Sequence, residues 1–163
     1  MAVQLQGNLV KKAHKKIKYT DKMLADLAKC SDPETGPMYF MENFLQIQHP
    51  TKGAIKFEPF KFQKNLVKNY HENRFSINML PRQTGKTTCA SAYLLWYAMF
   101  VPDSQILIAA HKYTGAQDIM NRFRYAYESV PDFIRPGIYS YNRNTIEFDN
   151  GSRVKATTTT ENT

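Results

Sequence analysis

The chain has 163 residues, which is long enough for one domain with a hydrophobic core and too short for two full domains. Its composition, 42% hydrophobic and 22% charged, is typical of a globular protein and excludes a chain that is disordered over its whole length. The formal net charge of +8 favours an anionic partner such as a nucleic acid, a nucleotide or a membrane surface, although charge alone identifies none of them.

Two classes of protein are disfavoured by local sequence. No apolar run approaches the roughly 20 residues needed to cross a bilayer, so we expect no membrane partner. The N-terminal lysine cluster follows a weakly apolar stretch, the reverse of the order in a secretory signal, and we expect the protein to stay in the cell that makes it. Cys30 and Cys89 lack the spacing of metal ligands, which predicts reduced thiols rather than a disulfide.

The N-terminal part is basic. Residues 11–29, KKAHKKIKYTDKMLADLAK, show a weak helical pattern, with Thr20 and Asp21 as candidate caps. A lysine run of this kind is usually a solvated face, although it also attracts phosphates without sequence preference. Residues 31–37, SDPETGP, are turn-rich. We therefore divide the chain into a basic N-terminal segment with its linker, residues 1–36, and a main unit, residues 37–163.

The main unit alternates between strand and helix patterns. Residues 38–62 predict a short helix, a turn and an extended stretch, and residues 63–72 predict a helix. Residues 75–80, FSINML, form a short apolar run of strand length, followed by an apolar helix over residues 87–100. The continuous apolar run QILIAA, residues 105–110, predicts a strand buried on both faces of a parallel sheet.

The last part of the chain predicts an amphipathic helix over residues 115–130 and then a hairpin. Two alternating runs flank Asn150 and Gly151, a pair that supplies positive φ at both turn positions of a β-hairpin. The order strand, helix, strand, helix implies a right-handed parallel α/β core.

The loop between the first predicted strand and its helix carries a recognisable motif. Residues 80–87, LPRQTGKT, hold the second half of the phosphate-binding motif G-x-x-x-x-G-K-[ST] without its first glycine. Gly85 permits a tight turn, and backbone amides at the positive end of the following helix cradle phosphates. Lys86 would reach the β- and γ-phosphates and Thr87 would hold Mg²⁺. The position between strand and helix favours nucleotide binding over a plain turn, and the predicted fold class is a partial P-loop NTPase core (α/β) with a β-hairpin and a basic helical N-terminal segment.

The same stretch resembles a known family. LPRQTGKTT resembles the deviant Walker A motif of phage large terminases, in which an Arg-Gln pair precedes Gly-Lys-Thr. AAHK and VPDFIRPGIYSYNRNTIEFDNGSRV resemble the corresponding stretch of the T-even-type large terminase subunit, and the likeness spans residues 57–153. The resemblance implies a DNA-packaging motor that uses ATP and Mg²⁺ to translocate double-stranded DNA into a capsid. It also implies a portal and a small terminase subunit as partners, and the host cell cytoplasm as location.

The resemblance assigns roles to individual residues. In the family an aromatic-Gln element recognises adenine, so that Phe62 would stack on the base and Gln63 would read its edge; the alternative is a core Phe62 and a surface cap at Gln63. Arg82 would act as an arginine finger in cis, or else contact phosphate in the ground state or form a salt bridge. The expected catalytic residues are Lys86 and Arg82, the metal ligand is Thr87, and the nucleotide-binding residues are Phe62, Gln63, Gln83, Thr84, Gly85, Lys86, Thr87 and Thr88.

Part of an ATPase is not found in the sequence. A strand ending in Asp-Glu, which would order Mg²⁺ and activate water, does not occur before Thr163, and neither do the clustered carboxylates of a nuclease. We therefore expect the front part of a larger terminase, without turnover by itself, whose open sheet edge promotes self-association. Two alternatives are a helicase-like translocase, which shares the Gln element and the phosphate loop, and a non-catalytic module that binds nucleic acid or a partner through its lysines.

Overall fold

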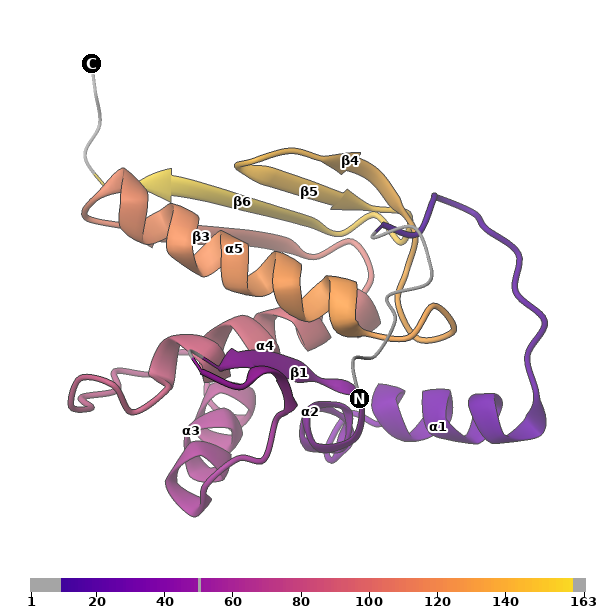
Figure 1. The fold of residues 1–163 in the computed structure, drawn as a ribbon, viewed down its shortest axis with the longest axis horizontal. Helices are drawn as coiled ribbons and strands as arrows, with labels where there is room; N and C mark the ends of the chain where they lie inside the picture. Colours follow the sequence, from indigo (N-terminus) through magenta and orange to yellow (C-terminus); the bar gives the residue numbers. More distant parts are fainter. Residues whose placement is uncertain (1–9, 50, 160–163) are drawn as a thin grey trace.

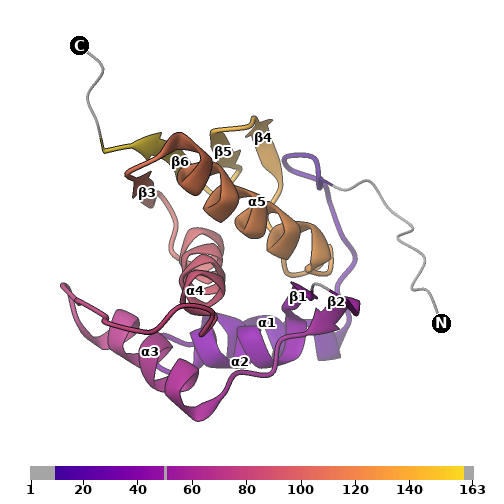
Figure 2. The same ribbon diagram turned by 60° about the vertical axis from the view of Figure 1, so that its left-hand side comes forward.

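The computed structural model describes residues 10–49 and 51–159 of the chain. Within this part the fold is mixed α/β, with five helices and two β-sheets, which confirms the predicted class at that level. A four-stranded sheet is covered on one face by the long helix α5 (Tyr113–Ser129), and the other helices lie on the far side of α5 (Figure 1). Figure 2 shows α4 (Lys86–Phe100) between α5 and the layer formed by α1, α2 and α3. No helix in the described ranges is long and apolar enough to cross a bilayer.

The N-terminal layer contains three helices and a small sheet. Helix α1 (Asp21–Ser31) starts where the sequence predicts, because the Thr20 side chain accepts a hydrogen bond from the Met23 amide at 3.4 Å. The predicted helical pattern before this cap is wrong, since Lys12 pairs with Ile138 as an isolated β-bridge and the chain then runs without helical structure to Thr20. Helix α2 (Gly36–Phe44), strands β1 (Gln46–His49) and β2 (Gly53–Lys56) and helix α3 (Lys61–Glu72) follow.

The larger sheet has the order β3-β6-β5-β4, and only β3 (Gln105–Ala110) and β6 (Arg153–Thr158) run parallel. Strand β3 is thus an edge strand of the described sheet. Its Ile108 is buried, but Leu107 on the opposite face is 65% exposed. The prediction that this strand is buried on both faces is wrong, because α5 covers one face and no described element covers the other.

Residues 75–80 do not form the predicted strand. Phe75, Ile77 and Met79 are 83%, 94% and 92% exposed, and the backbone joins neither described sheet. A strand exists only through hydrogen bonds to a neighbouring strand, and none of the described strands lies beside this segment. The apolar pattern therefore had the composition of a strand but did not predict a place in a sheet.

The predicted hairpin is confirmed, with β5 (Thr145–Phe148) paired antiparallel to β6 through Glu147 and Arg153. Gly151 has φ of 84°, but Asn150 does not adopt positive φ, so the expected two-residue turn is wrong. The connection is longer, and the Asn150 side chain donates instead to the carbonyls of Ala98 and Met99 at 2.9 and 3.2 Å. Asn150 therefore fastens the hairpin to the C-terminal end of α4. Strand β4 (Ile138–Tyr141) completes the sheet on the other side of β5.

Candidate phosphate-binding site

A tight backbone turn leads directly into α4. Gln83 and Gly85 both have positive φ, 64° and 76°, and the first α-helical hydrogen bond runs from the Cys89 amide to the Gly85 carbonyl at 3.0 Å. A left-handed conformation is unremarkable for glycine but uncommon for glutamine. The turn thus places the start of α4 immediately after the Gly-Lys-Thr sequence begins.

The first turn of α4 has free capacity for an anion. Its N-cap is Gly85, which has no side chain to accept from the helix amides, and no side-chain cap is formed. The first amides of a helix have no acceptor within the helix and lie at the positive end of its dipole. Thr87 and Thr88 lie in this turn and are partly buried. The arrangement is suited to binding phosphate or another anion.

Two side chains of the loop converge on its first residue. The Lys86 ammonium donates to the Pro81 carbonyl at 3.1 Å, and the Thr84 hydroxyl donates to the same oxygen at 3.0 Å. Lys86 is therefore folded back across the loop. A phosphate oxygen in place of this neutral carbonyl would give a charge-assisted hydrogen bond, which is roughly twice as strong.

Gln63 lies against the loop from the first turn of α3. Its side chain is only 6% exposed; its Oε1 accepts from the Phe60 amide at 2.9 Å and its Nε2 donates to the Thr84 carbonyl at 3.0 Å. The alternative of a surface cap is thus half right, because Gln63 caps α3 but is buried. Phe62 is 42% exposed and stacks on Phe60, with ring centroids 5.9 Å apart, so the alternative that Phe62 is a core residue is wrong.

Arg82 faces solvent at the same loop. Its side chain is exposed, and it forms no ion pair with any of the described residues. The structure therefore brings the loop residues Arg82 to Thr88 together with Gln63 and places the Phe60–Phe62 ring stack next to Gln63. Nothing in this geometry resembles the salt-bridge alternative for Arg82.

The family model described as terminase large subunit, T4likevirus-type, N-terminal, matches residues 77–163, more than half of the chain. The chain belongs to this terminase family. The match covers the LPRQTGKTT loop, the AAHK stretch at the end of β3 and residues 130–154 with the hairpin, which are the segments that carried the resemblance in the sequence. Membership makes the chain a component of a bacteriophage DNA-packaging machine.

A cavity of about 510 Å³ adjoins the loop in this terminase chain and has no signal in the sequence. It lies between β1, α4 and α5, and its lining includes Thr88 and Ser91 of α4 and Asp118 and Arg122 of α5. Ser91 is 2% exposed, and its hydroxyl has no hydrogen-bond partner among the described residues. Asp118 and Arg122 lie outside the Gly-Lys-Thr motif. Only the packing of α5 against α4 brings them beside Thr88 and Ser91. No group of three His, Cys, Asp or Glu side chains in the described part could hold a metal ion.

The two cysteines of the terminase chain are buried free thiols, as the sequence predicts. Burial raises the pKa of Cys30 to about 12 and that of Cys89 to about 11. Cys89 lies on the inner face of α4, three residues after Lys86. Thiols with such pKa values are unreactive at neutral pH, which assigns both residues to the core rather than to chemistry.

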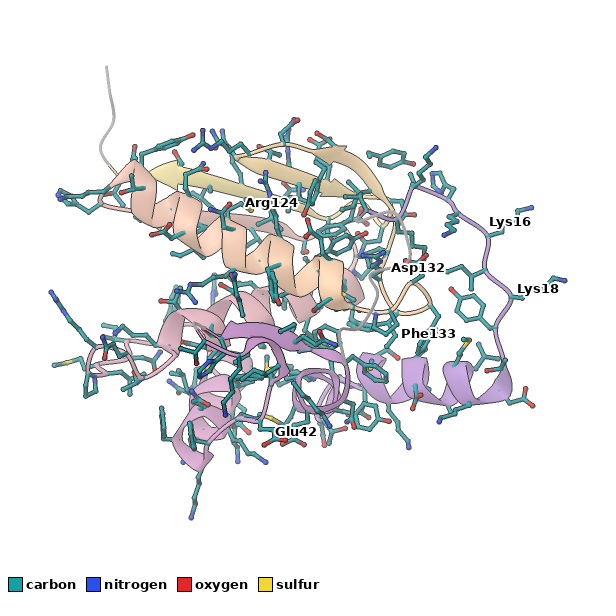
Figure 3. All side chains as sticks on the ribbon, in the orientation of Figure 1. Lys16, Lys18, Glu42, Arg124, Asp132 and Phe133 are labelled. Atoms are coloured by element: carbon teal, nitrogen blue, oxygen red, sulfur yellow. The ribbon has the colours of Figure 1, made fainter. Side chains whose placement is uncertain are left out.

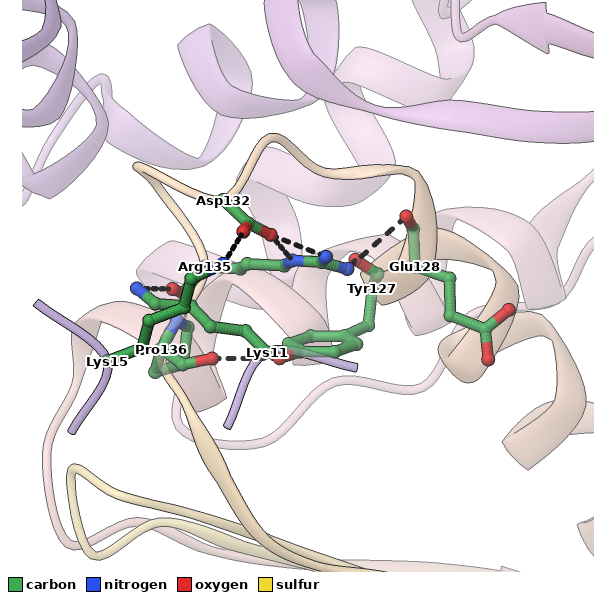
Figure 4. Close-up of polar contacts among 7 residues, drawn as sticks. All are labelled: Lys11, Lys15, Tyr127, Glu128, Asp132, Arg135 and Pro136. Atoms are coloured by element: carbon green, nitrogen blue, oxygen red, sulfur yellow. Dashed lines mark hydrogen bonds and ion pairs between the residues drawn. The ribbon is translucent and has the colours of Figure 1, made fainter. Parts of the chain in front are cut away.

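A second charged cluster of the terminase chain lies far from the loop, and we call it the clasp (Figure 4). Its members are Lys11, Lys15, Tyr127, Asp132 and Arg135. The Arg135 guanidinium is buried, pairs with Asp132 at 2.5 Å and lies over the Tyr127 ring at 5.1 Å. The Lys11 ammonium donates to the Arg135 carbonyl at 2.7 Å, and Lys15 pairs with Asp132 at 2.8 Å.

The clasp divides the N-terminal lysine run. Burial lowers the pKa of Lys11, and although burial also raises the pKa of Asp132, hydrogen bonds from Lys15 and Arg135 bring it below its usual value. Lys16 and Lys18, by contrast, project into solvent from the segment that leads to α1 (Figure 3). The run is therefore not one solvated face, because Lys11 is buried and Lys15 pairs with Asp132.

Proposed function

We propose that this chain is the ATP-binding part of the packaging motor and that residues 82–88 form its phosphate site, as part of a P-loop core. The observation that carries the proposal is the uncapped first turn of α4, which begins directly after left-handed Gly85 and has the Lys86 ammonium in the same loop. In the intact motor, ATP hydrolysis would drive translocation of double-stranded DNA into a capsid, together with a portal and a small terminase subunit in the host cytoplasm.

The roles follow from the chemistry of the residues present. Lys86 would exchange the Pro81 carbonyl for β- and γ-phosphate oxygens, and the amides from Gln83 to Thr88 would surround the phosphates. Thr87 would provide a hydroxyl ligand for Mg²⁺, which screens phosphate charge when it is bound. Exposed Arg82 would stabilise charge that develops on the phosphate, and the ring of Phe62, supported by Phe60, would offer a stacking surface to the base.

Calorimetric titration with Mg-ATP tests the proposal, with released phosphate assayed in the same samples. Lys86→Ala removes one charge-assisted contact, and the expected loss is about 1.5–3 kcal/mol, or roughly 10- to 150-fold in affinity. Lys22→Ala is the matched control, because Lys22 is exposed on α1 and forms no ion pair with a described residue. Equal ATP affinity in the wild-type chain and in Lys86→Ala would contradict a phosphate site at this loop.

A further inference from the structure

We propose that Gln63 is a positioning residue that holds the phosphate loop in its anion-binding shape, an inference that rests on the proposed function. The bond from Gln63 Nε2 to the Thr84 carbonyl, 3.0 Å long, joins α3 to the loop across 21 positions of the sequence. The opposite side of the same amide is fixed as well, because Oε1 accepts from the Phe60 amide at 2.9 Å. Because both polar atoms of the amide are hydrogen-bonded and Gln63 is only 6% exposed, the side chain is held in one orientation.

The orientation of the peptide group between Thr84 and Gly85 connects the Gln63 contact to anion binding. The carbonyl of Thr84 and the N–H of Gly85 belong to the same planar trans peptide, so they point in opposite directions. Because the carbonyl points to Gln63, the Gly85 N–H points away from the Gln63 amide and is not used by it. Loss of the bond would free this peptide to rotate and would remove a donor from the phosphate site.

Gly85 is matched to the same contact. A Cβ atom at Gly85 would lie 2.7 Å from Gln63 Nε2, and the residue has φ of 76°. Glycine therefore serves both the left-handed turn and the close approach of the glutamine amide. The two residues act as one unit, which the spacing of the motif in the sequence does not reveal.

A positioning role and a base-reading role for Gln63 predict different binding patterns. A residue that shapes the loop affects every ligand with phosphates, whatever its base. A residue that reads the base edge affects the preference between bases and leaves a ligand without a base unchanged. The amide retains one N–H and one lone pair beyond its two protein contacts, so the second role is chemically available and the experiment must separate the two.

The test uses three probes, Mg-ATP, Mg-GTP and Mg-tripolyphosphate, with the wild-type chain and with Gln63→Glu. Glutamate retains the acceptor for the Phe60 amide but cannot donate to Thr84. We expect all three affinities to fall together by about tenfold, with the ratio of ATP to GTP affinity unchanged. Gln105→Glu on β3 is the control for the added charge, because Gln105 is exposed and follows the far end of α4.

Each other outcome has a defined meaning. A changed ATP to GTP ratio with unchanged tripolyphosphate affinity would overturn the positioning role in favour of base reading, and unchanged affinity for all three probes would overturn it outright. Gln63→Met, which keeps the volume and loses both polar contacts, should show at least the same loss, and circular dichroism verifies that each variant is folded. Failure of the proposed function looks different: neither ATP nor tripolyphosphate would bind the wild-type chain, or Lys86→Ala would leave both affinities intact.

Discussion

The clasp and the loop before α4 both contain cationic side chains, but these side chains have opposite surroundings. In the clasp, Arg135 and Lys11 are buried and their charged groups contact Asp132 and backbone carbonyls of the same chain. In the loop, Arg82 is exposed and the first amides of α4 have no cap. Charged groups whose partners lie inside the protein stabilise the fold, whereas surface donors without such partners are available to a ligand.

The largest expected effect is on the stability provided by the clasp. Arg135→Met removes the buried guanidinium that donates to Asp132 and to the carbonyls of Tyr127 and Glu128. Loss of these charge-assisted hydrogen bonds should lower the free energy of unfolding by about 2–3 kcal/mol. Arg153→Met is the matched control, because the pair of Arg153 with Glu147 is exposed and should contribute less than about 1 kcal/mol. Urea denaturation measures both. Equal losses of stability in the two variants would contradict a stabilising role for the clasp.

The reactivity of Cys89 shows whether α4 is closed to solvent directly after the exposed loop. With a pKa of about 11, its thiolate fraction at pH 8 is roughly 100-fold lower than that of an ordinary thiol, and burial slows access further. Iodoacetamide should therefore modify native Cys89 at least about 100-fold more slowly than it modifies glutathione. Rapid modification without denaturant would show that α4 opens just beyond the loop.

Gly151 lies in the hairpin turn, where the absence of a side chain permits a close approach to the Asp103 carboxylate rather than the binding of a ligand. Gly151→Ala and Gly53→Ala both place a side chain at positive φ, which costs about 1–2 kcal/mol. Only at Gly151 would the new Cβ also collide with the Asp103 carboxylate, whereas the space around Gly53 is open. Gly151→Ala should therefore be the more destabilising change in urea denaturation, and Asp103→Ala should reduce the difference. Equal effects at both glycines would contradict this close approach.

The smallest expected effect concerns the apolar residues that precede the loop. Phe75, Ile77 and Met79 are exposed, so Ile77→Lys should weaken self-association by about 1 kcal/mol or less. Light scattering over a concentration series measures the effect, and Leu24→Lys on α1, where Leu24 is 52% exposed, is the control. A wild-type chain that is monomeric at every concentration would contradict self-association through this segment.

Local patterns were sufficient to predict most elements of this terminase chain. The helices α3, α4 and α5, the strand β3 and the hairpin all lie within a few residues of their predicted positions, because helical periodicity and an Asn-Gly turn are local signals. Two of the failures concern missing neighbours, whereas the helical pattern before Thr20 and the two-residue turn at Asn150 failed locally. The segment at residues 75–80 has the composition of a strand but no neighbour among the described strands. Strand β3 has the composition of a buried strand but one face that no described element covers.

The candidate site was predictable as a motif but not as a structure. Gly-Lys-Thr ahead of an apolar helix identified the loop, whereas the contact of Gln63 with Thr84 depends on how α3 packs against α4. The clasp had no sequence signal, because Lys11 and Arg135 are 124 positions apart and each resembles an ordinary surface charge when considered alone. Long-range pairing of polar groups is information that a single sequence does not display locally.

Amide NMR shifts on addition of Mg-ATP to the ¹⁵N-labelled chain test whether the start of α4 binds phosphate. If the uncapped start of α4 binds phosphate, the largest shifts will fall on the amides of residues 82–88, with the Gly85 amide among them. The amides of the clasp residues Lys11, Lys15, Tyr127, Asp132 and Arg135 will remain unchanged. Shifts centred on the clasp or on the exposed lysines, or no shifts at saturating Mg-ATP, would contradict the account.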